Sequence, residues 1–298
     1  MRLFPRELNI AWKSVRHGGK APGPDGLTAR DFALIADEEI ARLENELRAG
    51  KYVHGRYRKV WVPKDDGGRR LLCLASFRDR IVQRLLLERL TPSLEKLSSD
   101  ASFAYRPGRG VKDALHEVAR WRDREFTFAL RADVQDCFET IQLEVLTQML
   151  PRLQLGDEIT QLILEAVEVA WAGEPFQGLP QGAVLSPALC NLVLTPLDDE
   201  ITALSHVRFI RYADDFVILA QSRRRLEEAR RRVAYVLWSL GLRLNERKTV
   251  LTDFQHGFRF LGARLVRSFI IPEKPVRYPK RPPGPPTKRR GDGLGYFV

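Results

Sequence analysis

Two adjacent carboxylates, Asp214 and Asp215, lie between two apolar segments of the chain. The segments 206–212 and 215–220 are rich in β-branched and aromatic residues, which is typical of a β-hairpin with an acidic tip. Neighbouring carboxylates repel each other, so a largely buried hairpin that keeps both of them needs a counter-charge. Hard divalent cations prefer carboxylate oxygens. The pattern therefore predicts a divalent-cation site at the tip, although a polar turn would use the same residues.

A third carboxylate, Asp133, ends an apolar stretch at 126–134 that has the composition of a β-strand. In a split β-α-β sheet this strand can lie beside the acidic hairpin, so that Asp133 faces Asp214 across the sheet. Three carboxylates in one cleft can hold two Mg²⁺ ions about 3.5–4 Å apart. Such a site would orient an attacking hydroxyl and stabilise leaving pyrophosphate, which is most of what phosphoryl transfer requires. Taken alone, Asp133 could equally end a strand without any catalytic role.

Basic residues suited to a triphosphate lie on a second predicted hairpin, whose strands at 57–62 and 70–74 are joined by an Asp-Gly-Gly turn. Lys64 and Arg70 lie on its two arms and can converge on one anionic ligand, which arginine can bind with two hydrogen bonds. An exposed basic hairpin without a ligand would show the same pattern.

Two further segments contain candidate substrate residues. The sequence GLPQG at 178–182 is a glycine-rich loop before a helix, where the backbone and the amide of Gln181 can approach a nucleotide closely. It could also be a simple turn. Lys248 follows an amphipathic helix and precedes a strand. It is placed to protonate a leaving pyrophosphate as a general acid, or to lie on a strand edge without a catalytic role.

The elements that must position these residues follow from hydrophobic periodicity. Apolar residues recur at helical spacing in the segments 1–17, 30–49, 78–97, 142–150, 157–171, 184–200 and 222–240. Strands are also predicted at 248–252 and 258–265. From residue 126 onward the order is that of the split β-α-β arrangement, an α+β fold with an antiparallel sheet and helices on one face. This fold serves many functions, so it does not decide the chemistry.

Composition bounds the class of protein. The 298 residues, 44% of them hydrophobic and 29% charged, are typical of a globular protein of one or two domains. The formal net charge of +11 favours a polyanionic partner such as a nucleic acid, or simply a basic protein. Three widely separated cysteines without CxxC spacing indicate a reducing, cytoplasmic setting rather than a disulfide framework or a zinc site. Because the N-terminus and the rest of the chain lack long apolar runs, no export and no membrane contact are expected.

Taken in order, these segments resemble the reverse transcriptases of bacterial group II introns and their relatives. The resemblance covers nearly the whole chain before the C-terminal tail and rests on the blocks AWKSVRHGGKAPGPDGLT, RKVWVPKDDGGRRLLCLASFRDRIVQRLL, SFAYRPGRG, RADVQDCFETI, GLPQGAVLSPALCNLVLTPLD, RYADDFVIL, LGLRLNERKT and FRFLGARL. It implies the palm and the largely helical fingers of a right-hand polymerase. We expect fingers and an N-terminal part at 1–125, a palm at 126–270, a basic Pro-rich tail at 271–298, and no full thumb.

The resemblance also implies roles at the metal site. Asp133 and Asp214 match the principal metal ligands, Asp215 matches the third acid, and the carbonyl of Val134 is a further oxygen ligand. The implied cofactor is a pair of Mg²⁺ ions, with Mn²⁺ as an alternative. Lys248 matches the proposed proton donor.

The implied substrate contacts lie in other blocks. Phe138 matches the steric gate that excludes a 2′-hydroxyl and selects deoxynucleotides. The other matching positions are Lys64, Arg70, Gln181 and Gly182 for the dNTP, and Arg106, Arg109 and Tyr212 for the template and primer. One departure is that Ala104 and Tyr105 stand where the family has Gly-Phe, a change that should preserve packing.

The implied activity is that of an RNA-directed DNA polymerase, which uses an RNA template, a DNA or RNA primer and dNTPs. Short relatives of this lineage stand beside CRISPR adaptation genes or are fused to the spacer integrase. The preferred role is therefore spacer acquisition from RNA, with adaptation integrase proteins as partners. One alternative is an RNA-binding, maturase-like protein on a polymerase scaffold. Another is an antiphage defence polymerase that works without a template or from its own priming residue.

Overall fold

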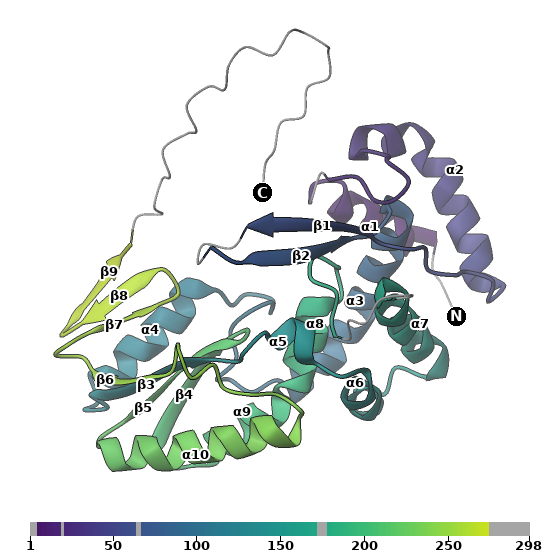
Figure 1. Cartoon of the computed structure of the whole chain (residues 1–298). Helices are drawn as coiled ribbons and strands as arrows, with labels where there is room; N and C mark the ends of the chain where they lie inside the picture. Colours follow the sequence, from purple (N-terminus) through teal and green to yellow (C-terminus); the bar gives the residue numbers. More distant parts are fainter. Residues whose placement is uncertain (1–4, 19–20, 64–66, 172–177, 274–298) are drawn as a thin grey trace, which may run out of the picture.

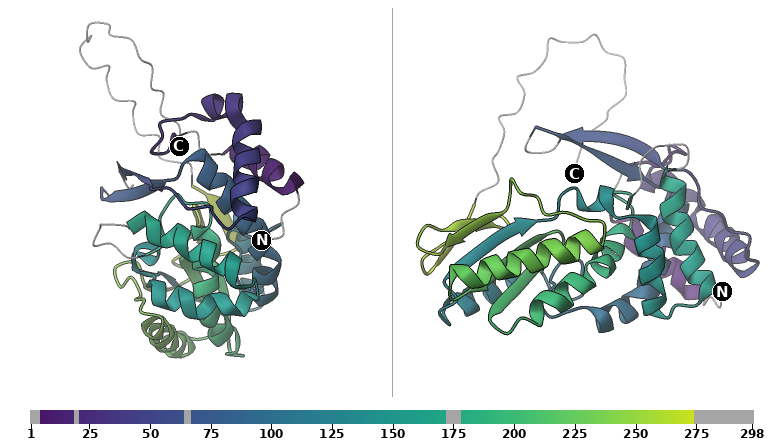
Figure 2. Two further views of the ribbon diagram at one scale, coloured as in Figure 1. Left: turned by 90° about the vertical axis from the view of Figure 1, so that its right-hand side faces the viewer. Right: turned by 60° about the horizontal axis from the view of Figure 1, so that its bottom comes forward.

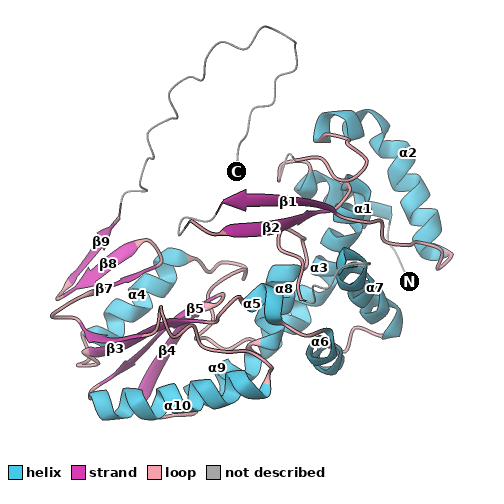
Figure 3. Ribbon diagram, in the orientation of Figure 1, coloured by secondary structure: helices cyan, strands magenta, loops and turns pink. Residues whose placement is uncertain are grey.

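The computed structural model describes residues 5–18, 21–63, 67–171 and 178–273. Its strands form three antiparallel sheets, and the largest of them lies apart from a group of helices at the other end of the molecule (Figure 3). The helices at the helical end come from two separate parts of the chain, 5–97 and 143–193, and the sheet end contains the helix at 111–122 and most elements after residue 195 (Figure 1). The architecture is the palm and fingers that the sequence predicts, although the helices at 143–149, 157–168 and 186–193, within the predicted palm segment 126–270, lie at the helical end.

The fingers consist of the helices α1 (Pro5–Val15), α2 (Ala29–Arg48) and α3 (Phe77–Leu97) and the hairpin of β1 (Arg58–Pro63) and β2 (Arg69–Leu74). These elements lie within one or two residues of the predicted segments, except at the N-terminal end of α1. The hairpin extends from the helical end in the direction of the palm (Figure 1).

An aromatic cluster holds the three finger helices together. The ring centroids of Trp12 and Phe32 lie 4.9 Å apart, and both rings also contact Phe77. Helix α2 begins at a capping box, in which the side chain of Thr28 accepts from the Asp31 amide and the Asp31 carboxylate accepts from the Thr28 amide. Burial of large aromatic surfaces and a well-capped helix give the fingers a rigid base for the hairpin.

The palm is a four-stranded antiparallel sheet with the strand order β4-β5-β3-β6. Strand β3 (Phe128–Asp133) pairs with β5 (Asp215–Ala220) on one side and with β6 (Val250–Asp253) on the other. Strand β4 (Val207–Tyr212) forms the edge next to β5. The sheet thus brings together strands that are far apart in the sequence.

Helices cover both faces of this sheet. On one face α9 (Thr195–Thr202) and α10 (Arg223–Ser239) pack over residues such as Phe216. The right-hand view of Figure 2 shows α10 lying lengthwise across the strands. On the opposite face α4 (Val111–Arg122) packs over residues such as Val217. The prediction of helices on one face was therefore incomplete. It omitted α4, which belongs to the palm by its packing although it lies within 1–125.

The remaining elements refine the predicted segments. Residues 142–150 and 157–171 form helices with short 3-10 ends, and two other predicted segments are each divided into two elements. The bounds are α5 (Cys137–Thr140), α6 (Leu143–Met149), η1 (Leu150–Leu153), α7 (Asp157–Glu168), η2 (Val169–Trp171), α8 (Ser186–Val193), β7 (Phe258–Phe260), β8 (Ala263–Val266) and β9 (Phe269–Pro272).

The division of these two segments has local causes. The predicted helix at 184–200 is α8 and α9, because Pro196 has no amide hydrogen to continue the ladder of α8. The predicted strand at 258–265 is the hairpin β7–β8, which reverses at two positive-φ residues, Leu261 (φ 50°) and Gly262 (φ 71°). Strand β9 was not predicted and extends two residues into the segment 271–298.

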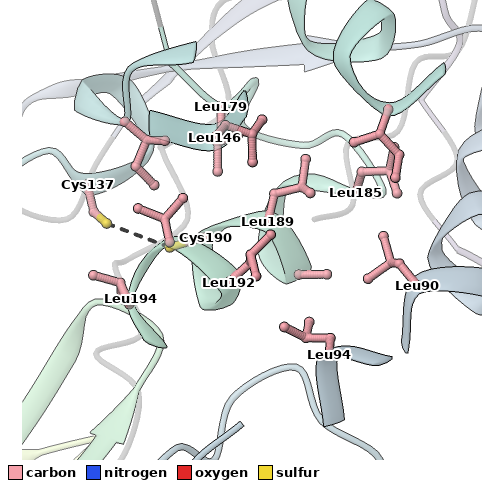
Figure 4. Packing of buried hydrophobic residues seen from close by; sticks show 14 of the residues in the cluster. Leu90, Leu94, Cys137, Leu146, Leu179, Leu185, Leu189, Cys190, Leu192 and Leu194 are labelled. Atoms are coloured by element: carbon pink, nitrogen blue, oxygen red, sulfur yellow. Dashed lines mark hydrogen bonds between the residues drawn. The ribbon is translucent and has the colours of Figure 1, made fainter. Parts of the chain in front are cut away.

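Helix α8 lies between the palm and the fingers and packs against helices of both. Figure 4 shows Leu189, Cys190 and Leu192 of α8 surrounded by Leu90 and Leu94 of α3, Cys137 of α5 and Leu146 of α6. The sulfur atoms of Cys137 and Cys190 lie 3.6 Å apart as free thiols. Because all these side chains are buried, the loop that leads into α8 is fixed relative to both halves of the molecule.

That loop, residues 178–185, contacts the fingers hairpin and α5. The amide of Cys73 in β2 donates to the carbonyl of Gln181 at 2.7 Å, and the amide of Leu179 donates to the carbonyl of Phe138 at 2.7 Å. Gly178 has φ 141°, and a Cβ there would lie 2.6 Å from the carbonyl oxygens of Phe138 and Glu139. A glycine is therefore required where the loop passes α5.

We predict that Gly178→Ala destabilises the protein by about 3 kcal/mol, because the methyl group meets backbone that cannot move aside and the φ is strained. Thermal denaturation should show a fall in Tm of several degrees. The matched control is Gly26→Ala, which has a positive φ of 72° but nothing within 4 Å of the added Cβ, so it should cost less. Equal losses in the two variants would contradict the close approach of the loop to α5.

Candidate active site

The register of the palm sheet brings Asp133 and Asp215 together. They are directly opposite each other at the end of the β3–β5 pairing. Directly opposite residues in an antiparallel pair present their side chains on the same face, with Cβ atoms about 4.5–5.5 Å apart. The sequence predicted that Asp133 faces Asp214, and this was wrong in detail, because Asp215 is its cross-strand partner and Asp214 lies in the turn.

Asp214 is held by the backbone of the neighbouring strand. The turn between β4 and β5 consists of Ala213 and Asp214, and Ala213 has a φ of 58°, which is unusual for a residue with a side chain. The amide of Val134, the residue after Asp133, donates to the Asp214 carbonyl at 3.0 Å. This bond ties the two acidic strand ends directly together.

The carboxylate of Asp133 is buried and only half satisfied. Lys248 donates from Nζ to its Oδ2 at 2.6 Å, whereas its Oδ1 is buried without a hydrogen-bond partner among the described residues. The ion pair with Asp133 raises the pKa of Lys248, so its ammonium group stays protonated. The structure thus places the predicted proton donor directly on a predicted metal ligand.

Burial and mutual repulsion make the other two carboxylates costly to ionise. Burial raises the pKa of Asp214, and the charge of Asp133 adds to the shift. Burial likewise raises the pKa of Asp215 to about 6, although Arg131 opposes the shift. The nearest contact is between Arg131 Nη2 and Asp215 Oδ1, at 3.4 Å. The three acids therefore need more positive charge than Arg131 and Lys248 provide.

A divalent cation fits this donor set. The orphaned Oδ1 of Asp133 is a hard oxygen donor, and an unsatisfied buried carboxylate oxygen costs roughly 1–3 kcal/mol. In the conformation described, however, no three acidic, histidine or cysteine side chains within the described ranges surround one ion position. In this conformation Asp133 Oδ2 already has a cationic partner, Lys248.

The predicted nucleotide residues surround the loop at 178–185. Gln181 donates from Nε2 to Glu139 Oε1 at 2.8 Å, next to Phe138 on α5. A Cβ at Gly182 would lie 3.3 Å from the Cys73 carbonyl, so Gly182 packs against β2. Arg70 pairs with Val62 in the β1–β2 ladder, and its exposed guanidinium has no ion pair with another described residue. Phe138 is half-buried. Lys64 lies outside the described residues.

Two predicted template contacts bond to neighbouring parts of the chain. The guanidinium of Arg106 bonds the Glu95 carboxylate and the carbonyls of Ser99 and Ser102, and its side chain is only 6% exposed. Arg109 bonds the carbonyl and the carboxylate of Asp100. Both arginines brace the loop before α4, which removes Arg106 from the residues free to bind a template backbone. Tyr212 is half-buried at the end of β4, opposite Asp215.

Sequence reasoning missed three side chains of the site. Arg131 precedes Asp133 by two residues on the same face of β3, a strand periodicity that could have identified it. Tyr105 has a φ of 58° and is 55% exposed, and the charges of Asp214 and Arg70 act on its phenol. Arg211 lies fully buried directly behind the acidic turn.

Comparison with known proteins shows which family the sequence matches. Residues 62–265 match the family described as "Reverse transcriptase (RNA-dependent DNA polymerase)". The matched span includes β2, the palm strands β3 to β5, the loop at 178–185 and Lys248. Every candidate residue of the site thus lies within it.

Three curated relatives extend over most of the chain. Protein YkfC of Escherichia coli is 28% identical, covering 84% of this chain and 77% of its own length. The Group II intron-encoded protein LtrA of Lactococcus lactis is 23% identical over 87% of this chain and 55% of its own length. The Retron Mx65 reverse transcriptase of Myxococcus xanthus is 30% identical over 83% of this chain and 58% of its own length. The chain thus spans little more than half of the last two proteins.

Solved structures share the fold. Apo telomerase from Candida tropicalis superposes with a TM-score of 0.59 at 13% identity, covering 77% of this chain and 52% of that one. At this identity the likeness concerns architecture only, and it matches the palm and fingers described above. Separately, no helix among the described residues has both the length and the apolar character needed to cross a membrane.

Removing the charge of Asp214 should stabilise the metal-free protein. The isosteric Asp214→Asn eliminates a buried charge and its repulsion with Asp133, so we expect a gain of about 1 kcal/mol in the free energy of unfolding. Thermal denaturation in EDTA should give a higher Tm than wild type. Added Mg²⁺ should raise the Tm of wild type only.

The control for that experiment is Asp37→Asn, which changes an exposed carboxylate of α2 far from the acids and should leave both measurements unchanged. A lower Tm for Asp214→Asn than for wild type in EDTA would mean that the carboxylate is already compensated without an ion.

Proposed function

Because this chain belongs to the reverse transcriptase (RNA-dependent DNA polymerase) family, we propose that it adds deoxynucleotides to a primer 3′-hydroxyl on an RNA template. The observation that supports this most is the pairing of Asp133 with Asp215 beside the Asp214 turn. It places three acids at one end of the palm sheet, where their charges need a cation. A protein that only bound RNA would have no use for acidic side chains beside its polyanionic ligand.

Asp133, Asp214 and Asp215 would hold the Mg²⁺ ions, with the Val134 carbonyl as a further oxygen. A bound pair of such ions supplies charge neutralisation for the attacking and leaving oxygens. The chain's own contribution is to fix the ligands, since the β3–β5 register and the bond from the Val134 amide to the Asp214 carbonyl leave the acids little freedom.

The fingers would bind the incoming nucleotide. Arg70 is exposed on β2, so its guanidinium can bind a triphosphate with two hydrogen bonds. Gln181 and Gly182 lie between β2 and α5, where they would contact the base and sugar. Phe138 on the same side would pack against the sugar. The loop at 178–185 bonds both β2 and α5, so we infer that a movement of the fingers hairpin would also move Gln181 and Gly182.

Lys248 would donate a proton to the leaving pyrophosphate. Its ammonium is kept protonated by Asp133, and its side chain is 49% exposed, so a substrate can reach it from solvent. The same contact neutralises Asp133 before any substrate binds. Lys248 thus exchanges its partner during the cycle, from a carboxylate to a phosphate oxygen.

A primer-extension assay tests the proposed function. Purified protein with Mg²⁺, a primed RNA template and labelled dNTPs should give DNA complementary to the template. Asp214→Asn should make no product while binding RNA as tightly as wild type, because it changes charge at the acids without altering the fold. Tight RNA binding by a wild-type protein that makes no product would instead favour a maturase-like binding protein. Product without any template would favour a template-independent or self-priming defence polymerase.

Phe138→Ala should reduce discrimination between dNTPs and rNTPs, because the aromatic ring no longer occupies the space beside the 2′ position. Loss of one packing contact of this size changes specificity by roughly 10–100-fold. The ratio of kcat/KM for dATP and ATP measures it. The matched control is Phe128→Ala, which removes a ring at the end of β3 remote from Asp133 and should keep the wild-type ratio. An unchanged ratio for Phe138→Ala would remove its role as the gate.

The biological setting rests on resemblance alone. We propose that RNA is copied into DNA during CRISPR spacer acquisition, with adaptation integrase proteins as partners. Co-purification of the chain with such an integrase, and loss of RNA-derived spacers in cells that carry Asp214→Asn, would support this role. Spacers acquired from RNA at the wild-type rate in those cells would contradict it.

A further inference from the structure

We propose that Arg211 is a positioning residue for the acidic turn, which it holds through the carbonyl of Ala213, and that Asp198 and Asn191 fix it in place. This inference deepens the proposed function and rests on it, because it assigns the side chains that aim Asp214. None of the three side chains has a place in the mechanism described above.

Arg211 makes an unusually complete set of contacts for a buried side chain. Its side chain is 1% exposed and that of Asp198 is 0% exposed. Nε donates to Asp198 Oδ1 and Nη2 to Oδ2, both at 2.6 Å, which is a two-pronged ion pair. Nη1 donates to Asn191 Oδ1 and to the Ala213 carbonyl, both at 2.9 Å. The pair with Asp198 fixes the plane of the guanidinium, so the direction of Nη1 toward the turn is fixed as well.

The turn has a physical need for such a donor. Ala213 adopts a φ of 58°, a conformation that disfavours residues other than glycine by roughly 1–2 kcal/mol per residue. The peptide group between Ala213 and Asp214 must therefore be held from outside. Arg211 holds the carbonyl before Asp214, and the Val134 amide holds the carbonyl of Asp214 itself at 3.0 Å. The two carbonyls on either side of the Asp214 α-carbon are therefore each held by a hydrogen bond, one from the Arg211 side chain and one from the Val134 amide.

The same network reaches the loop before α4. Asn191 donates from Nδ2 to the Ala104 carbonyl at 2.8 Å, next to the exposed Tyr105. The main chain of Arg211 exchanges hydrogen bonds with the same loop, donating to Ala101 and accepting from Phe103. The acidic turn and the loop that contains Tyr105 are therefore both bonded to the network of Arg211 and Asn191, which fixes their separation.

Stability alone is a weak explanation for this ion pair. A buried pair can often be replaced by apolar side chains of similar volume with little loss or even a gain in stability. Burial lowers the pKa of Arg211, but the charge of Asp198 and the hydrogen bonds to it together raise the pKa above its usual value, so the guanidinium stays protonated. What an apolar pair cannot replace is the bond to the Ala213 carbonyl.

The test uses the full chain with Arg211 and Asp198 replaced together, as Arg211→Met/Asp198→Leu. Both charges leave, so no buried ion is stranded and the fold is kept, which circular dichroism and Tm check. Mn²⁺ binding, followed by electron paramagnetic resonance without substrate, should weaken about tenfold. In primer extension kcat should fall roughly 10–100-fold, as expected for a misplaced catalytic group, whereas RNA affinity stays at the wild-type value.

The matched control is Arg78→Met/Glu46→Leu, which removes a less buried ion pair between α3 and α2 and should leave Mn²⁺ binding and kcat unchanged. Should the first double variant not fold, Arg211→Lys keeps a charge beside Asp198 but cannot reach Asp198 and the Ala213 carbonyl at once. It should weaken Mn²⁺ binding about threefold or more.

A folded double variant, or Arg211→Lys, with wild-type Mn²⁺ affinity would overturn the inference. The metal measurement does not require polymerase activity, so it separates this inference from the proposed function. A wild-type protein that binds Mn²⁺ but extends no primer would refute only the proposed function.

Discussion

The antiparallel pairing of β3 with β5 is the constraint on which the site depends. A shift of one residue in this register would send Asp133 to the face packed by α9 and α10 and remove it from its partner. The register is secured because the alternate residues of both strands are buried against helices on opposite faces, so neither face tolerates the slip. Packing of apolar residues far from the acids thus determines where the acids lie.

The site itself works against the stability of the fold. Three acids at one strand end, two of them with raised pKa values, are held by hydrogen bonds to the backbone and by Arg131, Lys248 and Arg211. Each of these side chains acts on a different group: Arg131 on the Asp215 carboxylate, Lys248 on the Asp133 carboxylate and Arg211 on the turn. In the proposed function, this division keeps the acids in place before a cation arrives, which is the preorganisation that phosphoryl transfer demands.

Much of this arrangement was predictable from the sequence, because hydrophobic periodicity locates helices and strands within a few residues and the acidic hairpin is a local pattern. Three features were not. Helix α4 has only two fully buried residues, Ala114 and Val118, so its apolar stripe is short. The partner of Asp133 depends on register, which no local signal specifies. Arg211 resembles any basic residue before an acidic turn, and only the burial of Asp198 in α9 gives it a role.

The central claim is that Asp133 and Asp214 share a divalent cation, and anomalous diffraction from crystals grown with Mn²⁺ tests it most directly. The account predicts an anomalous peak about 2.0–2.2 Å from carboxylate oxygens of both residues, with Lys248 displaced from Asp133 Oδ2. A map in which Lys248 keeps that contact and Mn²⁺ binds only elsewhere on the surface would contradict the claim.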